Sequence, residues 1–156
     1  MGIVADRLTE LGLTLPAVAA PLATYVPAVR SGKYVYTSGQ LPFVDGVLPA
    51  QGKVGDGVGL VDPADAAGHA RTAALNAVAA VAALIGDLDQ VRRVVKVVGY
   101  VASDPSFTAQ PRVINGASNL LGEIFADAGV HARTAVGVTV LPHNSPVELD
   151  LLLELH

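Results

Sequence analysis

Two residues near the carboxyl end of the sequence have the charge and spacing to act together on a small anionic molecule. Arg133 lies one residue before a β-like run within 131–142, and Glu148 lies near the start of a second strand pattern. A guanidinium stays charged at physiological pH and binds a carboxylate through two parallel hydrogen bonds. A partly buried carboxyl group can have its pKa raised toward the range of an acid–base group. The pair predicts a carboxylate receptor beside an acid or base.

Each of the two residues also has a purely structural interpretation. Arg133 would fit an ion pair between subunits, for example with Asp150 of a neighbouring copy. Glu148 would fit an ordinary polar position on a strand whose side chains alternate between two faces. From the residues alone, these alternatives stay open.

The composition indicates one domain that hides part of its surface in an oligomer. The chain has 156 residues, of which 51% are hydrophobic and 15% charged. One domain of roughly 100–200 residues is the usual unit, and charged residues usually make up about 25% of a domain. So small a charged fraction predicts that apolar surface is covered by other subunits.

Charge and residue types exclude several functional classes. The net charge is −4, from 14 acidic and 10 basic residues, which argues against a groove for nucleic-acid phosphates. The absence of cysteine excludes disulfides and thiolate chemistry, and it fits a cytoplasmic location. The four histidines have no metal-ligand spacing, so neither a metal nor another cofactor is expected. Residues 1–10 do not resemble a signal peptide, and the apolar run 73–85 is shorter than a membrane span of about 20 residues.

Hydrophobic periodicity predicts a layered α+β domain, residues 23–156, behind an N-terminal leader, residues 1–22, with a short helix at 5–11. Residues 42–63 are expected to form a loop, mobile at 52–59 and dispensable for folding, like the leader. In the last strand, the apolar positions 147, 149, 151, 153 and 155 are expected to face the helices. The other elements are expected at 25–29 and 34–38 (a hairpin), 62–86 (helix), 91–101 (strand), 107–128 (helix), 134–140 and 147–155 (strands).

Seven short motifs, in order and at matching spacing over about residues 23–155, resemble the Rid superfamily of reactive intermediate deaminases. This family is also called the YjgF or L-PSP endoribonuclease-like family. No motif is specific alone, but the set is. The motifs are Tyr25 to Gly32, Tyr36-Thr37-Ser38-Gly39-Gln40-Leu41-Pro42, Val94-Val95-Lys96, Ile114-Asn115, Ala132-Arg133-Thr134, Leu141-Pro142 and Val147-Glu148-Leu149-Asp150.

The resemblance implies a chorismate-mutase-like fold, a mixed β-sheet with two main helices on one face. It further implies a homotrimer with ligand clefts between subunits. Deaminase members of the family hydrolyse enamines and imines derived from amino acids to a 2-keto acid and ammonia. By position, Arg133 would bind the carboxylate and Glu148 would activate the attacking water.

Four further residues gain candidate roles in substrate binding from the resemblance, and a fifth, His131, from its position two residues before Arg133. The backbone N–H of Gly39 would donate to an anion and Ser38 would accompany it, although the two also fit a simple turn. Tyr25 would cover the cleft or sit half-buried in a hairpin. Asn115 would contact the ligand or cap a helix. His131 would line the cleft or lie in a surface loop.

Departures from the compact family members place this chain in a longer, divergent subgroup. It has the leader, a longer loop at 43–62, and Ala135 where cysteine is common. Three functions follow as hypotheses: an imine/enamine deaminase-like hydrolase, a non-catalytic trimer that binds a small carboxylate metabolite, and an endoribonuclease of the L-PSP type. We expect an enzyme of the first kind, acting on a small carboxylate and not on nucleic acid.

Overall fold

Apolar side chains line one face of the β-sheet, and two helices cover that face. The computed structural model describes residues 2–18, 20 and 24–156. The strands form one sheet in the order β1-β2-β5-β3-β4, in which only β3 and β4 are parallel. Their bounds are Ala28–Ser31 (β1), Tyr34–Thr37 (β2), Val91–Ala102 (β3), Ala132–Val138 (β4) and Val147–Leu155 (β5).

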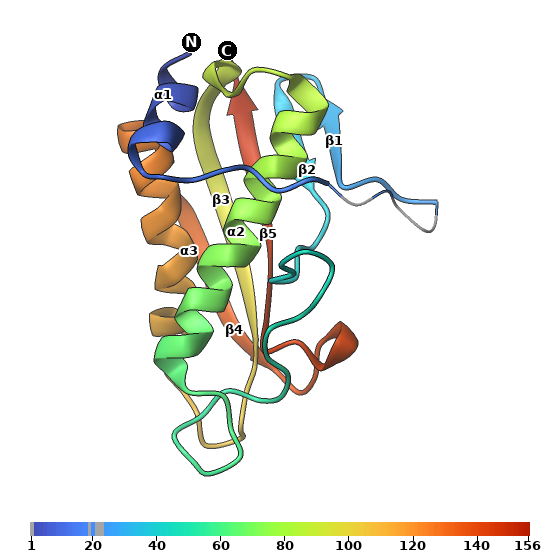
Figure 1. The fold of residues 1–156 in the computed structure, drawn as a ribbon, viewed down its shortest axis with the longest axis vertical. Coiled ribbons are helices and arrows are strands. Elements are labelled where there is room, and N and C mark those ends of the chain that lie inside the picture. The colour runs from blue at the N-terminus through green and yellow to red at the C-terminus, as the bar shows by residue number, and fades with distance from the viewer. Residues whose placement is uncertain (1, 19, 21–23) are drawn as a thin grey trace.

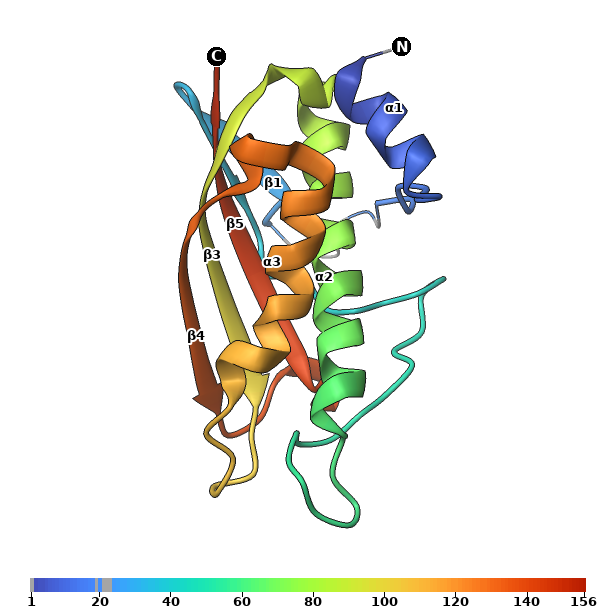
Figure 2. The ribbon, with the colours of Figure 1, turned by 90° about the vertical axis from the view of Figure 1, so that its left-hand side faces the viewer.

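The helices form a second layer on one face of the sheet, and a short N-terminal helix lies on the helix layer (Figures 1 and 2). Among the residues described, no helix covers the opposite face, which we call the open face. The mixed α+β fold predicted from the sequence is therefore confirmed. The helices are α1 (Ile3–Glu10), α2 (Pro63–Ile85) and α3 (Gln110–Phe125), with 3-10 turns η1 (Leu88–Gln90), η2 (Ala126–Gly129) and η3 (Pro142–Asn144).

The side chains of β5 alternate between the helix-covered face and the open face of the sheet, as predicted. The five apolar positions from Val147 to Leu155 are at most 1% exposed and join the core under α2 and α3. Glu148, Asp150, Leu152 and Glu154 are half-buried and lie on the open face. Tyr36 of β2, opposite Leu152, adds a large exposed side chain to this face.

Helix α2 begins as the sequence predicts. Asp62 caps it through its carboxylate, which accepts from the backbone N–H of Ala64 at 2.8 Å, and Pro63 occupies the first helical turn.

Small residues bring α2 and α3 into close contact. A Cβ at Gly116 would lie 1.9 Å from the Ala67 carbonyl oxygen, so only glycine permits this approach of α3 to α2.

Helix α2 is long and apolar enough to cross a membrane by length and composition alone, because it extends well beyond the apolar run 73–85. Its apolar residues, however, include the most buried alanines of the core, and they pack on the sheet and on α3. This is the surface of a core helix.

The start of the segment 52–59, in the loop between β2 and α2, is bonded to the domain, whereas Val58 further along it is fully exposed; that the segment is mobile and dispensable for folding stays a prediction. Val54 is fully buried, and its backbone N–H donates to the Ala102 carbonyl at 2.7 Å while its carbonyl accepts from Asp104. Gly52 donates to the Asn144 carbonyl at 2.8 Å. The segment thereby extends the pairing at the end of β3, which the glycine-rich sequence conceals.

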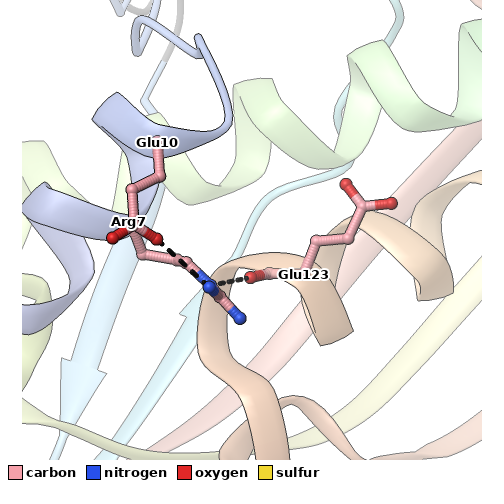
Figure 3. Close-up of polar contacts among 3 residues, drawn as sticks. All are labelled: Arg7, Glu10 and Glu123. Carbon is pink, nitrogen blue, oxygen red and sulfur yellow. Dashed lines mark hydrogen bonds and ion pairs between the residues drawn. The ribbon is translucent and has the colours of Figure 1, made fainter.

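The leader is also bonded to the domain, through α1, which begins two residues earlier and ends one residue earlier than predicted. Val4 and Leu8 belong to the same hydrophobic core as the sheet. The Asp89 carboxylate accepts from the backbone N–H groups of Ile3 and Val4 at 2.7 and 2.8 Å, and this caps α1 from outside the helix. Arg7 donates to the Glu123 carbonyl oxygen of α3 at 3.0 Å and pairs with Glu10 (Figure 3). Leader positions 1, 19, 21 and 22 lie outside the described residues.

Candidate functional site

Arg133 is fixed by α3 and lies on the helix side of the sheet. It is the second residue of β4, inside the strand and not one residue before it as predicted. It is paired with the fully buried Val97 of β3, and paired residues of neighbouring strands point to the same face. Its Nη1 donates to Asn115 Oδ1 at 2.8 Å and to Ser118 Oγ at 3.2 Å.

Asn115 lies in the second turn of α3, which begins at Gln110, so it is not a helix cap. It shares a helix face with Ser118, three residues later. Among the residues described, the ion pairs do not include Arg133. Its bonds within the chain go to neutral oxygens, so the guanidinium charge stays available to an anion.

A pocket opens beside Arg133, and sequence reasoning missed part of its lining. Its volume is about 320 Å³. Within it, Ser118 Oγ lies 2.9 Å from His131 Nε2, and His131 Nδ1 contacts the carbonyl oxygen of Gly129. The spacing of Ser118 from Asn115 along one helix face was a usable signal for its inclusion. The pocket is lined by Ser118, Gly122, Gly129, Val130, His131 and Arg133.

Glu148 lies on the open face against the backbone of Gly39. Gln40 exchanges two backbone hydrogen bonds with Leu149, which brings the end of β2 beside β5. A Cβ at position 39 would overlap the Glu148 carboxylate, which would then have to shift, so glycine lets the carboxylate lie directly against this backbone. The structure thus brings Gly39 and Glu148 together, as the prediction of a shared site requires.

An acidic cluster surrounds Glu148 on the open face. Burial raises the pKa of the Glu148 carboxyl, and the charge of Asp150 raises it further. Burial also raises the pKa of Asp150, while a hydrogen bond from the Tyr100 hydroxyl at 3.3 Å acts in the opposite direction. The phenol of Tyr100 has a raised pKa, first from burial and then from Asp150. A carboxyl group in such surroundings holds a proton at higher pH than an exposed one.

Ser38 and Tyr25 contact neither Arg133 nor Glu148 through a hydrogen bond among the described residues. The Ser38 hydroxyl donates to the Val26 carbonyl at 2.6 Å, and its backbone N–H donates to the Pro27 carbonyl at 2.8 Å. In this chain Ser38 therefore fixes the segment that carries Tyr25. Tyr25 lies outside β1, which begins at Ala28, and its side chain is 62% exposed. The prediction that Tyr25 lies in a strand is wrong, and its ring is available to another molecule.

Arg133 and Glu148 lie on opposite faces of the same sheet. Arg133 is level with Val97 on the helix side, and Glu148 is level with Tyr100 on the open side, with β3 between β4 and β5. Two strand spacings and three residues separate their Cα atoms by roughly 14 Å. Since their side chains also point apart, one protomer cannot place both groups on one small ligand.

The described residues contain no group of three or more histidine, cysteine, aspartate or glutamate side chains that could hold a metal ion. The candidate site consists of an arginine, carboxyl groups and neutral hydrogen-bond donors and acceptors.

Comparison with known proteins adds a family and several relatives. The family model described as "YjgF/chorismate mutase-like, putative endoribonuclease" matches residues 5–155. The Trypanosoma cruzi protein TCP17 is 46% identical over 156 residues, which cover 99% of this chain and 96% of the relative.

Solved structures agree with this match. The protein Atu1372 from Agrobacterium tumefaciens, of unknown function, is 46% identical with a TM-score of 0.89, covering 98% of this chain and 92% of that one. A protein from Shewanella oneidensis MR-1, described as "a putative endoribonuclease", is 34% identical with a TM-score of 0.92, covering 99% of this chain and 100% of that one. Escherichia coli TdcF, solved with bound serine, is 21% identical with a TM-score of 0.62, covering 89% and 94%, and this likeness concerns the fold alone.

Proposed function

The chain belongs to the YjgF/chorismate-mutase-like family, and from this premise we propose that it hydrolyses imines and enamines derived from amino acids. The substrate is a small 2-imino or 2-enamino acid in the cytoplasm, and the products are a 2-keto acid and ammonia. The active form is a homotrimer, and each site lies between two copies.

The observation that carries this proposal is the separation of two complementary half-sites. One half is cationic: Arg133 held by Asn115 and Ser118 at the β4 edge. The other half is acidic: Glu148 beside Gly39 on the open face. Since the two cannot meet within one chain, a ligand that contacts both must lie between the cationic half of one copy and the acidic half of the next. A head-to-tail contact of this kind closes into a ring when its rotation permits.

The open face has the character of a surface that another copy covers. Leu152 and Asp150 are half-buried already within the protomer, and Tyr36 is 46% exposed. The low charged fraction of the whole chain agrees with this. Covering the face would further bury Glu148 and would raise its pKa in the same direction as burial within the protomer does.

The chemistry requires one anion receptor and one proton carrier. Arg133 would bind the substrate carboxylate through its fork, which leaves the C=N carbon beside the neighbouring copy's acidic half. Glu148 in its protonated form would protonate an enamine carbon to give the imine. As a carboxylate it would then accept a proton from the water that attacks the imine carbon. The resulting carbinolamine loses ammonia and leaves the 2-keto acid.

A trimer that binds the carboxylate without turnover is the second candidate. The observation that favours it is that the cationic half is complete within one chain, whereas the Ser38 hydroxyl is bonded to Val26 and is not directed at a ligand. The bound serine of TdcF is compatible with both candidates, because serine has the carboxylate and nitrogen of the proposed substrate.

An endoribonuclease activity, which the family description names, has less support. The open face places Glu148, Asp150 and Glu154 together, and phosphodiesters are repelled by such a surface. The cationic half offers one arginine, where a phosphate backbone needs several contacts.

The decisive experiment generates 2-aminoacrylate in place with a serine dehydratase and follows pyruvate release. The proposal predicts faster release with the wild-type protein, and a much smaller acceleration with Arg133→Ala or Glu148→Gln alone. Copies of the two variants, unfolded and refolded together, should regain activity, because some interfaces then combine an intact arginine with an intact glutamate. Absence of acceleration by the wild-type protein at high concentration would favour the binding trimer. Activity that mixing never restores would contradict a site shared between copies.

A further inference from the structure

The hydrogen bonds around Ser118 have a direction that the geometry fixes. A backbone carbonyl can only accept, so His131 Nδ1, which contacts the carbonyl oxygen of Gly129, must carry its hydrogen. In the neutral ring Nε2 is then an acceptor. The Ser118 hydroxyl, 2.9 Å from Nε2, must therefore donate its only proton to His131.

Arg133 uses a second position on the same oxygen. Its Nη1 donates to Ser118 Oγ at 3.2 Å. A hydroxyl has one donor and two acceptor positions. With its proton on His131 and one lone pair on Arg133, Ser118 keeps one lone pair for the pocket that it lines. Toward a ligand beside Arg133, Ser118 can accept a hydrogen bond but cannot donate one.

We propose that Ser118, oriented by His131, selects carboxylates that carry a hydrogen-bond donor on the neighbouring carbon. This inference rests on the proposed function and names its substrate class more closely. Imino, enamino and amino acids have an N–H at that position, whereas the keto acid product has only an oxygen acceptor. The lone pair of Ser118 would attract the former and repel the latter, so the site favours substrate over product.

The remaining walls of the pocket leave room for an apolar substituent. Gly122 and Gly129 have no side chains, and Val130 offers an apolar surface that is 74% exposed in the protomer. A short apolar group, such as the methylene or methyl of a three-carbon acid, fits beside them. Ser118 is thus a specificity residue, and His131 is a positioning residue that acts through it.

The test is a comparison of lactate, as both enantiomers, with pyruvate by titration calorimetry. The two acids have the same charge and carbon skeleton, but only lactate has a donor next to its carboxylate. One neutral hydrogen bond contributes about 1 kcal/mol, which predicts roughly three- to tenfold tighter binding of one lactate enantiomer. In Ser118→Ala this preference should fall close to one. Asn119→Ala, an exposed position on the same helix, is the control and should keep it.

Variants of His131 separate orientation from packing. His131→Gln retains an acceptor for the Ser118 proton and should keep the preference for lactate. His131→Leu frees that proton, so Ser118 can donate to the keto oxygen, and the preference should shift toward pyruvate. A purely structural role of His131 would change the thermal midpoint in both variants without changing the ratio.

The inference is overturned if wild-type protein binds pyruvate as tightly as lactate, binds neither, or keeps its preference in Ser118→Ala. A different result would contradict the proposed function while leaving this inference intact. A protein that prefers lactate through Ser118 but does not accelerate pyruvate release from 2-aminoacrylate would be the selective binding trimer.

Discussion

The cationic and acidic half-sites differ in how far a single chain completes them. Around Arg133, α3 and β4 supply a connected set of hydrogen bonds in which each polar group has a partner. Around Glu148, three titratable groups are half-buried together, and burial raises the pKa of each. No ion pair within the described residues involves Glu148 or Asp150.

From this difference we expect ligand binding to depend on the cationic half and proton transfer to depend on the acidic half. A neutral, satisfied network holds an arginine in a fixed geometry at little cost, which suits a receptor. Carboxyl groups crowded on a poorly solvated face are destabilised as anions, and the same destabilisation makes them useful proton carriers. Substitutions in one half should therefore change binding, and substitutions in the other half should change turnover.

The largest effect is expected from Glu148→Gln in the acidic half. General acid–base groups commonly contribute about 10²–10⁴-fold to rate, so turnover should fall by that factor. Affinity for a carboxylate should stay nearly constant, because Arg133 is unchanged. Rates with 2-aminoacrylate and calorimetry with lactate measure the two quantities. A comparable loss of binding would show that Glu148 belongs to the receptor and that this separation of binding from proton transfer is wrong.

Arg133→Ala in the cationic half should weaken carboxylate binding by roughly one to two decades, because hydrogen bonds to charged groups contribute about 1.5–3 kcal/mol. Arg133→Lys should retain only part of the wild-type affinity, since an ammonium cannot form the two parallel hydrogen bonds of a guanidinium. Arg112→Ala, an exposed arginine on α3, is the matched control. Sedimentation should find the variant's assembly unchanged. If Arg133→Ala instead separates the copies, the arginine is an interface residue.

The sequence was sufficient for the elements but not for the faces on which the candidate residues lie. Alternation in β5 and the Asp62-Pro63 start of α2 are local signals, and both are confirmed. That Arg133 and Glu148 lie on opposite faces depends on strand order and on the parallel pairing of β3 with β4. No spacing within one strand records that pairing.

Two contacts were missed for the same reason. Val54 lies in a glycine-rich segment, but it is buried and its backbone is bonded to Ala102 and Asp104, far along the chain. Ser118 was not named as a candidate, although it links His131 to Arg133 in the pocket. Neither contact has a local signal in the sequence, whereas the remote pairs Gly39–Glu148 and Asn115–Arg133 were named through the family resemblance.

The acidic half should also make stability depend on pH. Burial raises the folded-state pKa of Glu148 and of Asp150 above the unfolded values. The native state therefore binds more protons than the unfolded state between the two values. This contribution to stability is full below about pH 4 and is lost as pH rises through the raised folded values.

Asp150→Asn removes one of these titrations and the charge that raises the pKa of Glu148. The decline of the thermal midpoint from about pH 4 to neutrality should be shallower in the variant than in the wild-type protein. Because the pKa of Glu148 falls, the limb of the rate profile that depends on protonated Glu148 should move to lower pH. An unchanged slope and an unchanged limb would mean that the acids of the open face do not interact as described.

The smallest effect is expected from adding a methyl group to the cationic half at Gly122. This glycine lies inside α3, and an added Cβ would meet no atom within 4 Å. Alanine in a helix interior is favoured over glycine by roughly 0.5–1 kcal/mol, so Gly122→Ala should raise the thermal midpoint slightly. Gly68→Ala in α2 is a matched control, because its Cβ also meets nothing within 4 Å. Both variants should gain similar stability. Because Gly122 lines the pocket, Gly122→Ala should alter lactate affinity and Gly68→Ala should not, and Gly122→Leu should weaken lactate binding further.

Equal binding by all three variants would mean that the ligand does not enter the pocket beside Arg133. A lower midpoint for Gly122→Ala alone would mean that another copy packs against this turn of α3.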